Sequence, residues 1–310
     1  MTASALIIGG KGFVGPNLAR QLADRYDVVL AGRDCDIRDG DAVRRTIRAL
    51  DPVLVVNLAA ITTVRESFER PQETYAIGFS GLLDLLNALQ ASGFSGRFLH
   101  VSSSEVYGHP APDQLPLVEG SPLRPLSPYA VAKAAGELLC RQRSRGCAFD
   151  ILVARPFTHI GPGQSSRFSI ASFSHQIARI MLGARKGAIE VGALNATRDL
   201  TDVRDTVRAY DLMLHKGRNG QLYNVCSGRE VLMLDVLREL IRLSGCQVDI
   251  VQNPALVRAA EQSRLRGSYA ALEAATGWKP HYTLTQTLSD ILTHLIDSAT
   301  ANAGPGATSK

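Results

Sequence analysis

A strand-like run that leads directly into a glycine-spaced turn constrains the fold of this chain most. Residues 5–8 (Ala-Leu-Ile-Ile) are apolar and partly β-branched, which is typical of a buried parallel strand. Residues 17–25 show helical periodicity, so the turn lies between a strand and a helix. Glycines in that place let a pyrophosphate approach the backbone, and the helix start faces its negative charge. The pattern predicts a dinucleotide bound at this turn. The expected contacts are Gly9, Gly12, Phe13, Val14 and Gly15.

The composition excludes several classes of protein. The chain has 310 residues, 45% hydrophobic and 20% charged, which suits a soluble protein of one large α/β unit or two modest domains. A net charge of +5 with scattered basic residues does not indicate a nucleic-acid partner, although it suits an anionic ligand. None of the five cysteines has C-x-x-C spacing, so free thiols in a reducing cytosol are expected. We see no signal peptide and no run as long as a membrane span, and therefore expect a cytoplasmic protein without a membrane partner.

The end of the second predicted strand, residues 27–31, bears on the choice of cofactor. In a dinucleotide-binding fold, an acid at this point suits a free ribose hydroxyl, whereas an arginine suits a 2′-phosphate. Arg33 is the better-placed residue, so NADP(H) is favoured, but Asp34 keeps NAD(H) open. Asp36 and Ile37 are expected to border the adenine.

Two further strands end in candidate site residues. The strand at 53–57 is followed by a stretch beside which a cofactor can pass close to the backbone, namely Leu58, Ala59 and Ala60. The strand at 97–101 ends in three serines and a carboxylate: Ser102, Ser103, Ser104 and Glu105. Ligands of open parallel sheets bind outside the carboxyl ends of the strands, so both stretches are expected to line the site. The histidines His159 and His175 have no partner at ligand spacing, and no metal is expected.

A predicted helix start carries a possible acid–base pair. Ser127 is a good N-cap and Pro128 suits the first helical position. Tyr129 and Lys133 are four residues apart and therefore share one face of the helix. A nearby ammonium and the positive helix start both favour a phenolate. We therefore expect Tyr129 to pass a proton at neutral pH.

Together these residues resemble the extended short-chain dehydrogenases/reductases that act on nucleotide sugars. The resemblance runs from about residue 5 to 297. Its further markers are Glu105-Val106-Tyr107-Gly108, Arg155-Pro156-Phe157, Gly161-Pro162-Gly163, and Arg198-Asp199 with Asp202 and Asp205. Within the family, three segments are most similar to reductases of GDP-linked 4-keto-6-deoxy sugars: residues 159–164, 223–228 and 276–280.

The resemblance implies an α/β fold with a doubly wound parallel sheet, and it implies a division of the chain into two parts. Residues 1–160, with a returning segment near 193–230, would form the dinucleotide-binding Rossmann part. Residues 161–297 would form a smaller α/β part that binds the substrate. The polar residues 298–310 are predicted to be a disordered tail. Homodimerisation is expected through a four-helix contact made by residues 71–91 and 127–145.

The resemblance also implies catalytic roles. Ser103 would hydrogen-bond the keto oxygen of the sugar, and Tyr129 would donate the proton. Lys133 would bind the nicotinamide ribose and bias Tyr129, while Arg155 would lie near the nicotinamide. The implied reaction is the NAD(P)H-dependent reduction of GDP-4-keto-6-deoxy-D-mannose to GDP-6-deoxy-D-mannose.

Substrate contacts and rival reactions follow from the same resemblance. The GDP-sugar contacts are expected to be Ser104, Glu105, Thr158, Arg198, Arg258 and Glu261. Thr158 stands where the family usually has an asparagine, and Gly78 stands where a helix usually offers one. Glu105 occupies the position of the acid in related 4,6-dehydratases, so a GDP-mannose 4,6-dehydratase or a nucleotide-sugar epimerase remains open. A non-catalytic dinucleotide sensor would be expected to lose Tyr129 or Lys133, and both are present.

Overall fold

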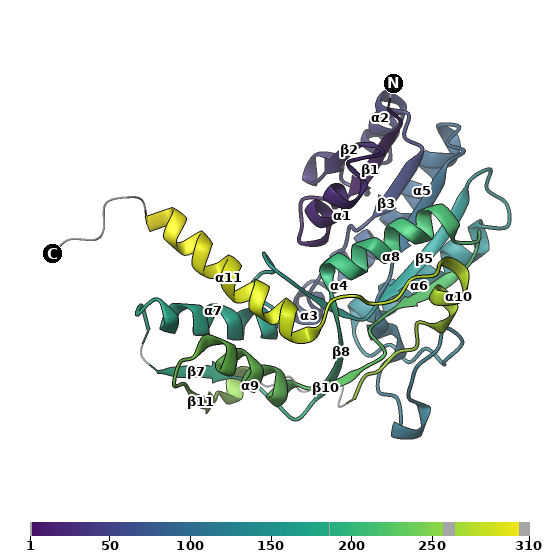
Figure 1. Ribbon diagram of the computed structural model, residues 1–310. Helices are drawn as coiled ribbons and strands as arrows, with labels where there is room; N and C mark the ends of the chain where they lie inside the picture. The colour runs from purple at the N-terminus through teal and green to yellow at the C-terminus, as the bar shows by residue number, and fades with distance from the viewer. Residues whose placement is uncertain (1, 186, 257–263, 304–310) are drawn as a thin grey trace.

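The computed structural model describes residues 2–185, 187–256 and 264–303. Its main sheet has six parallel strands in the order β2-β1-β3-β4-β5-β9, with helices on both faces (Figure 1). The strands are β1 (Ser4–Ile8), β2 (Asp27–Ala31), β3 (Leu54–Asn57), β4 (Arg97–Val101), β5 (Asp150–Pro156) and β9 (Leu222–Val225). This architecture confirms the predicted doubly wound α/β fold. The strand order reverses between β1 and β3, where such sheets bind their ligands at the carboxyl ends.

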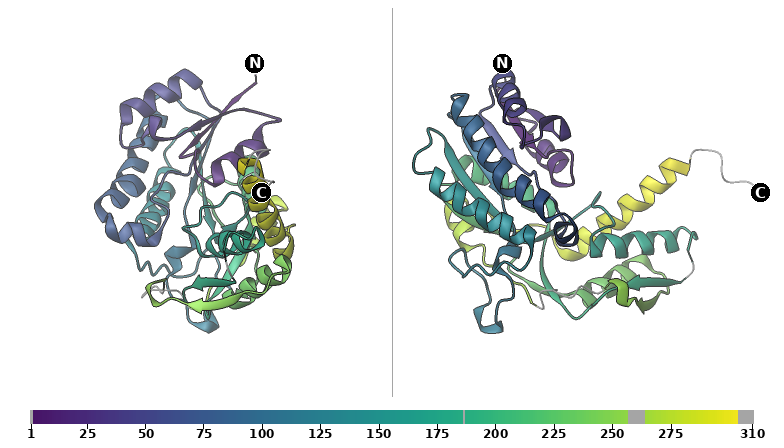
Figure 2. Two further views of the ribbon diagram at one scale, coloured as in Figure 1. Left: turned by 90° about the vertical axis from the view of Figure 1, so that its left-hand side faces the viewer. Right: turned by 180° about the vertical axis from the view of Figure 1, so that it is seen from behind.

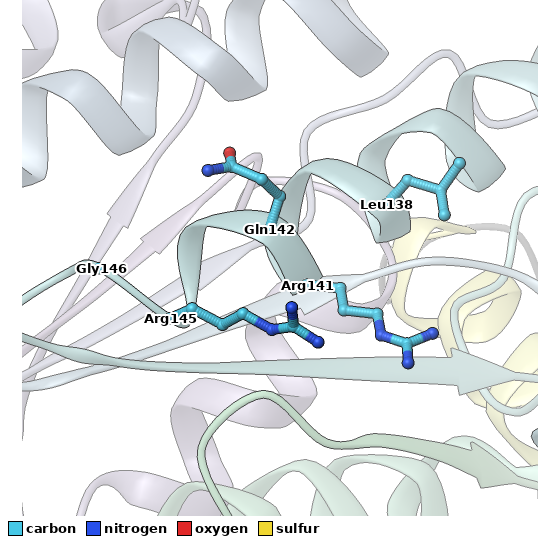
Figure 3. Close-up of a pocket in the computed structure, with 5 residues that line it drawn as sticks. All are labelled: Leu138, Arg141, Gln142, Arg145 and Gly146. Carbon is cyan, nitrogen blue, oxygen red and sulfur yellow. The ribbon is translucent and has the colours of Figure 1, made fainter.

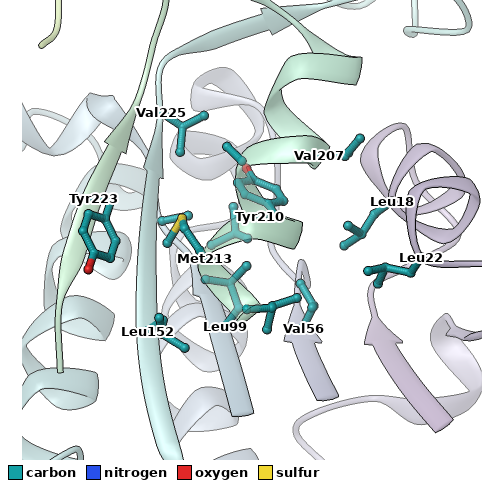
Figure 4. Close-up of a cluster of buried hydrophobic side chains, with 14 of the residues drawn as sticks. Leu18, Leu22, Val56, Leu99, Leu152, Val207, Tyr210, Met213, Tyr223 and Val225 are labelled. Atoms are coloured by element: carbon teal, nitrogen blue, oxygen red, sulfur yellow. The ribbon is translucent and has the colours of Figure 1, made fainter. Parts of the chain in front are cut away.

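The inner strands of this sheet bury both of their faces, because their side chains alternate between two cores. In β1, Ile7 packs in the core with α1 and α8, whereas Leu6 and Ile8 pack in the core with α2, α5 and α6. Figure 4 shows the first core, in which Leu18 and Tyr210 face the sheet from α1 and α8. The covering helices are α1 (Val14–Leu22), α2 (Gly40–Leu50), α5 (Leu82–Ala91), α6 (Pro128–Arg143) and α8 (Val203–Lys216).

A second part of the chain has its own core. It contains a three-stranded sheet of order β10-β8-β6 and a parallel pair of β7 and β11. These strands are β6 (Thr158–Ile160), β7 (Ala188–Val191), β8 (Thr197–Asp202), β10 (Glu230–Leu232) and β11 (Asp249–Gln252). The helices α7 (Ser169–Met181), α9 (Met233–Ser244) and α11 (Leu284–Ala303) share one apolar cluster with β6, β7, β8 and β10. Helix α8 and strand β9 follow β8 in the chain but return to the six-stranded sheet.

Short elements lie between the longer helices and strands. The short helices are α3 (Val64–Glu69), α4 (Pro71–Tyr75) and α10 (Ala270–Thr276). The 3₁₀ turns are η1 (Arg33–Cys35), η3 (Ser104–Tyr107), η4 (Pro112–Gln114) and η5 (Pro254–Leu256). No helix in the described ranges is long and apolar enough to cross a membrane.

The helix predicted over residues 71–91 is interrupted. A π-helical turn, η2 (Ala76–Gly81), separates α4 from α5. A Cβ atom on Gly78 would lie 2.8 Å from the Cβ of Ala132, so the missing side chain lets this turn touch α6. Gly81 likewise makes room for Ile37, whose Cγ1 would lie 2.8 Å from an added Cβ. Close packing against two neighbours thus accompanies the wider turn, as is common for π-bulges at functional sites.

Helix α11 extends further than expected. It continues to Ala303, whereas a disordered tail was predicted from residue 298. Its first half packs Leu288, Ile291 and Leu292 into the core, and its second half projects from the body in the right-hand view of Figure 2. Alanines favour helix propagation once such an anchored segment exists. Residues 304–310 lie outside the described residues.

Candidate functional site

The glycine turn forms a cradle in which side chains have no room. Gly9 has a φ of +71°, and a Cβ atom there would lie 2.6 Å from the backbone nitrogen of Ala59. A Cβ atom on Gly15 would lie 1.8 Å from the carbonyl oxygen of Gly10. The turn therefore lies directly against Leu58 and Ala59, and Ala60 follows them in the chain. The exposed backbone and the start of α1 suit a pyrophosphate.

The turn after β2 carries an ion pair, Asp34 with Lys11, of which the sequence indicated only Asp34. Asp34 Oδ1 accepts hydrogen bonds from Lys11 Nζ at 3.0 Å and from the Gly32 nitrogen at 2.9 Å. The bond from Lys11 is the largest cause that lowers the pKa of Asp34. Arg33 is exposed on the same turn. The Asp34 carboxylate is thus paired with Lys11 of the glycine turn. A basic residue within the glycine turn was the only sequence signal that could have indicated this pair.

The two residues expected near the adenine lie in different surroundings. The Asp36 carboxylate is paired with Arg38, whose NH2 atom lies 2.5 Å from Oδ2. Ile37 is buried in the core between α2 and α5. Only Asp36 therefore presents its side chain at the surface.

The helix with the predicted acid–base pair begins at Pro128, as expected. The Ser127 side chain caps it by accepting a hydrogen bond from the Ala130 nitrogen at 3.1 Å. The first two turns of α6 bring Tyr129 and Lys133 to the end of β4, where Lys133 Nζ donates to the Val101 carbonyl at 2.6 Å. Lys133 Nζ lies 5.8 Å from the centre of the Tyr129 ring.

Ser103 completes this group. Its side chain is hydrogen-bonded to Tyr129, and its Oγ also accepts from the Glu105 nitrogen at 3.2 Å. Ser104 is buried at the start of η3, and Glu105 is partly exposed beside it. Ser102 points elsewhere, because its hydroxyl donates to Glu137 Oε1 at 2.5 Å. The structure therefore brings Ser103, Tyr129 and Lys133 together.

The protonation of the pair differs from the expectation that Tyr129 is tuned towards phenolate. Burial raises the pKa of Tyr129 to about 12, although the hydrogen bond with Ser103 opposes this, and the charge of Glu105 adds to it. Burial also lowers the pKa of Lys133 to about 8, which the charge of Glu137 opposes. The desolvation of the phenolate outweighs the nearby ammonium. Tyr129 therefore holds its proton at neutral pH, as a general acid must.

Arg155 lies in surroundings that differ from the expected nicotinamide contact. The residue is only 2% exposed, and its guanidinium meets Glu137 through Nε at 2.9 Å and NH2 at 2.5 Å. The guanidinium carbon lies 4.6 Å from the centre of the Tyr107 ring. The charge is thus held inside the protein rather than at the outer edge of the strands.

The predicted substrate residues lie partly within the described structure. Thr158 on β6 pairs with Leu200 of β8, and Arg198 on β8 is partly buried, with NH1 donating to the Thr197 carbonyl at 2.8 Å. Arg258 and Glu261 lie outside the described residues. The Phe13 ring of the glycine turn stacks on His159 at 6.1 Å and 10°, which links the turn to the second part. In the sequence, His159 was considered only as a family marker and as a metal ligand, not as a contact of the glycine turn.

Two other features do not contribute to this site. A surface hollow of about 570 Å³ is lined by Leu138, Arg141, Gln142, Arg145 and Gly146 (Figure 3). It lies at the far end of α6, with Arg141 about 12 Å along the helix axis from Lys133. Among the described residues, no group of three or more His, Cys, Asp or Glu side chains is placed to hold a metal ion.

Comparison with known proteins identifies the family. The sequence pattern of the family described as GDP-mannose 4,6 dehydratase matches residues 30–291. The chain belongs to this family of extended short-chain dehydrogenases/reductases. A family member from Pseudomonas aeruginosa, GDP-6-deoxy-D-mannose reductase, is 42% identical over 295 residues, covering 94% of this chain and 97% of the relative. A solved structure, RMD from Pseudomonas aeruginosa complexed with NADPH, has a TM-score of 0.89 and 41% identity over 96% of this chain and 100% of that one.

A relative from Sordaria araneosa carries the name of a different reaction. GDP-mannose 4,6-dehydratase sdnI is 27% identical over 278 residues, 83% of this chain and 50% of the relative. Membership of the GDP-mannose 4,6-dehydratase family therefore does not by itself distinguish reduction from dehydration. The greater identity and the fuller coverage belong to the reductase.

Proposed function

We propose that this protein uses NADPH to reduce the 4-keto group of GDP-4-keto-6-deoxy-D-mannose, forming GDP-6-deoxy-D-mannose. The observation that carries the proposal is the 42% identity to the reductase over 94% of the chain. The group of Ser103, Tyr129 and Lys133 at the strand ends supports it, because the same group suits the chemistry of carbonyl reduction.

The glycine turn suits the proposed cofactor. The space that a Cβ atom would fill at Gly9 and Gly15 lets a pyrophosphate approach the backbone. Gly12 and Phe13 would line the same turn, and Lys133 would bind the nicotinamide ribose. When bound, NADPH supplies the hydride for the keto carbon.

Side chains of the protein would then bind and protonate the keto oxygen. Ser103 would hydrogen-bond that oxygen and hold it against Tyr129. As the carbon accepts the hydride, Tyr129 would transfer its phenolic proton to the oxygen and complete the hydroxyl group. The Lys133 ammonium would stabilise the phenolate left on Tyr129 until the proton is replaced. Arg198, with Arg258 and Glu261, would hold the GDP portion, and an arginine fork suits phosphate oxygens.

The reaction can be tested with the purified protein. We expect NADPH absorbance to fall when enzymatically made GDP-4-keto-6-deoxy-D-mannose is added. Chromatography of the product should show GDP-6-deoxy-D-mannose. If neither NADPH nor NADH is consumed, the proposed function is wrong.

Dehydration is the second candidate, because Glu105 is partly exposed beside Tyr129. In a reductase, Glu105 transfers no proton, so Glu105→Gln should keep kcat within about tenfold of the original. In a dehydratase, loss of this base would cost about 10²–10⁴-fold. The deciding measurement is turnover of GDP-mannose without added reductant, compared with turnover of the 4-keto sugar with NADPH.

The cofactor preference gives a further prediction. Arg33→Ala should weaken NADPH binding about tenfold, because a charged contact to the 2′-phosphate contributes about 1.5 kcal/mol or more. NADH binding should change little, since Lys11 still pairs with Asp34. Fluorescence titration of both cofactors measures the ratio, with Arg44→Ala on the exposed side of α2 as the control. Equal weakening of NADPH and NADH binding would contradict the assignment of Arg33.

We also propose a homodimer formed through α4, α5 and α6. Apolar side chains are exposed on α4, on the turn η2 that leads into α5, and on α6: Tyr75, Phe79, Val131 and Leu138. A cytoplasmic location is proposed from the five cysteines, all of which are free thiols.

A further inference from the structure

A buried carboxylate joins three elements directly behind the candidate catalytic group. Glu137 on α6 is 5% exposed and accepts from Ser102 at the end of β4 and from Arg155 on β5. Ser102 immediately precedes Ser103, and Glu137 lies one helical turn after Lys133. The carboxylate therefore connects the strand that carries the serine to the helix that carries the tyrosine and the lysine.

The same cluster extends to the loop after η4. Arg155 NH1 donates to the Glu119 carbonyl at 3.3 Å, and Glu119 Oε1 accepts from the Asn224 nitrogen at 2.8 Å. The Tyr107 hydroxyl, under the guanidinium, donates to Asn224 Oδ1 at 2.8 Å. Both oxygens of Glu137 are thus held by partners that are themselves fixed. A carboxylate so held stays in one position.

Apart from Glu137, few groups around Lys133 stabilise its positive charge. The residue is 4% exposed, and its ammonium donates to the carbonyl of Val101. The groups that face it are Tyr129, Glu137 and Cys140 from α6 and His100 from β4. Burial raises the pKa of the Cys140 thiol and lowers the pKa of His100 well below its usual value, so both are neutral near pH 7. Glu137 is the charge among these groups that favours the ammonium.

We propose that Glu137 is a positioning residue that keeps Lys133 protonated for the reaction, and that Arg155 fixes its carboxylate in the required place. The inference rests on the proposed function, because it assigns a role to the environment of the proposed catalytic lysine. It also gives Arg155 a role other than cofactor contact. Arg155 and Lys133 together carry two positive charges against one carboxylate. The surplus charge is available to stabilise the Tyr129 phenolate when its proton has been transferred.

The test measures how NADPH affinity depends on pH. Lys133 would bind the nicotinamide ribose as an ammonium, so affinity should fall as the pH rises through its pKa of about 8. In Glu137→Gln the favourable charge is lost and the shape is kept. The midpoint of this fall should move to lower pH by about one unit or more. At pH 6, NADPH should bind Glu137→Gln within about threefold of the original, because the ammonium is then present in both.

Ser102→Ala is the matched control. It removes one hydrogen bond from the same carboxylate without removing its charge, so the midpoint should stay within about 0.3 pH units. A Glu137→Gln midpoint equal to that of the original protein would overturn the proposal. The same holds if Ser102→Ala and Glu137→Gln shift it equally, because a merely structural role predicts that result.

A second variant covers the case in which Glu137→Gln does not fold with Arg155 unpaired. Glu137→Gln/Arg155→Met removes both charges of the pair, a replacement that buried ion pairs often tolerate. Its midpoint should also move to lower pH, with folding checked by thermal melting. If neither variant folds, the pair serves stability and the proposal is wrong. The titration needs no sugar, so a wild-type protein that binds NADPH but reduces no keto sugar would overturn only the proposed function.

Discussion

Replacing Tyr129 by phenylalanine is expected to lower kcat about 10²–10⁴-fold, because the variant loses the group that protonates the keto oxygen. The ring remains half-buried, and only the hydroxyl that bonds to Ser103 is removed. NADPH affinity should stay within about threefold, since Lys133 keeps its bond to Val101. The measurement is the rate of NADPH consumption with saturating keto sugar, together with fluorescence titration of NADPH.

Tyr26→Phe is the matched control for this prediction. The Tyr26 hydroxyl lies 2.8 Å from His215 Nε2, after α1 and away from the strand ends. Its removal deletes a hydroxyl of the same kind, and kcat should stay within about twofold. If Tyr129→Phe retained more than about a tenth of the original kcat, another group would have to supply the proton.

Replacing Asp199 by alanine is expected to lower the free energy of unfolding by about 3 kcal/mol or more. The Asp199 carboxylate is 0% exposed and accepts from Ser227 N and Oγ, both at 2.7 Å, and from the nitrogens of Gly228 and Gly267, both at 3.0 Å. It therefore ties β8 to two loops that are distant in the sequence. Without it, three backbone N–H groups lose their partner, and each costs about 1–3 kcal/mol when left unsatisfied.

Urea denaturation followed by circular dichroism measures this loss of stability. Asp235→Ala serves as the control, because that carboxylate is exposed on α9 and meets Arg238 at only 3.5 Å. Its removal should change the free energy of unfolding by no more than about 0.5 kcal/mol. An unchanged denaturation midpoint in Asp199→Ala would show that the loops keep their positions by other contacts.

Local features of the fold were predictable because short segments determine them. The strands at β1, β2 and β4 and the start of α6 follow from apolar runs, from an N-cap serine and from a proline at the first helical position. The π turn before α5 was not predictable in this way. It depends on the contacts of Gly78 and Gly81 with Ala132 and Ile37, and nothing in residues 71–91 shows these contacts.

The protonation of Tyr129 and the ion-pair partners of Asp34 and Arg155 were also not predictable from the sequence. The spacing of Tyr129 and Lys133 indicated that they share a helix face, but burial, not spacing, decides which form Tyr129 takes. The partners of Asp34 and Arg155 come from other elements, namely the glycine turn and α6. A desolvation cost or a distant counter-charge can be seen only when the chain is folded.

The strand–glycine turn–helix pattern by itself determined the nucleotide-binding architecture, because only glycine fits where backbones touch at Gly9 and Gly15. The sequence also determined which residue types are available for carbonyl chemistry, through Ser103, Tyr129 and Lys133. The tertiary structure alone decided that Tyr129 holds its proton and that Glu137 and Arg155 stand behind Lys133. The reason is physical: local geometry depends on neighbouring residues, whereas charge and protonation depend on everything that burial brings close.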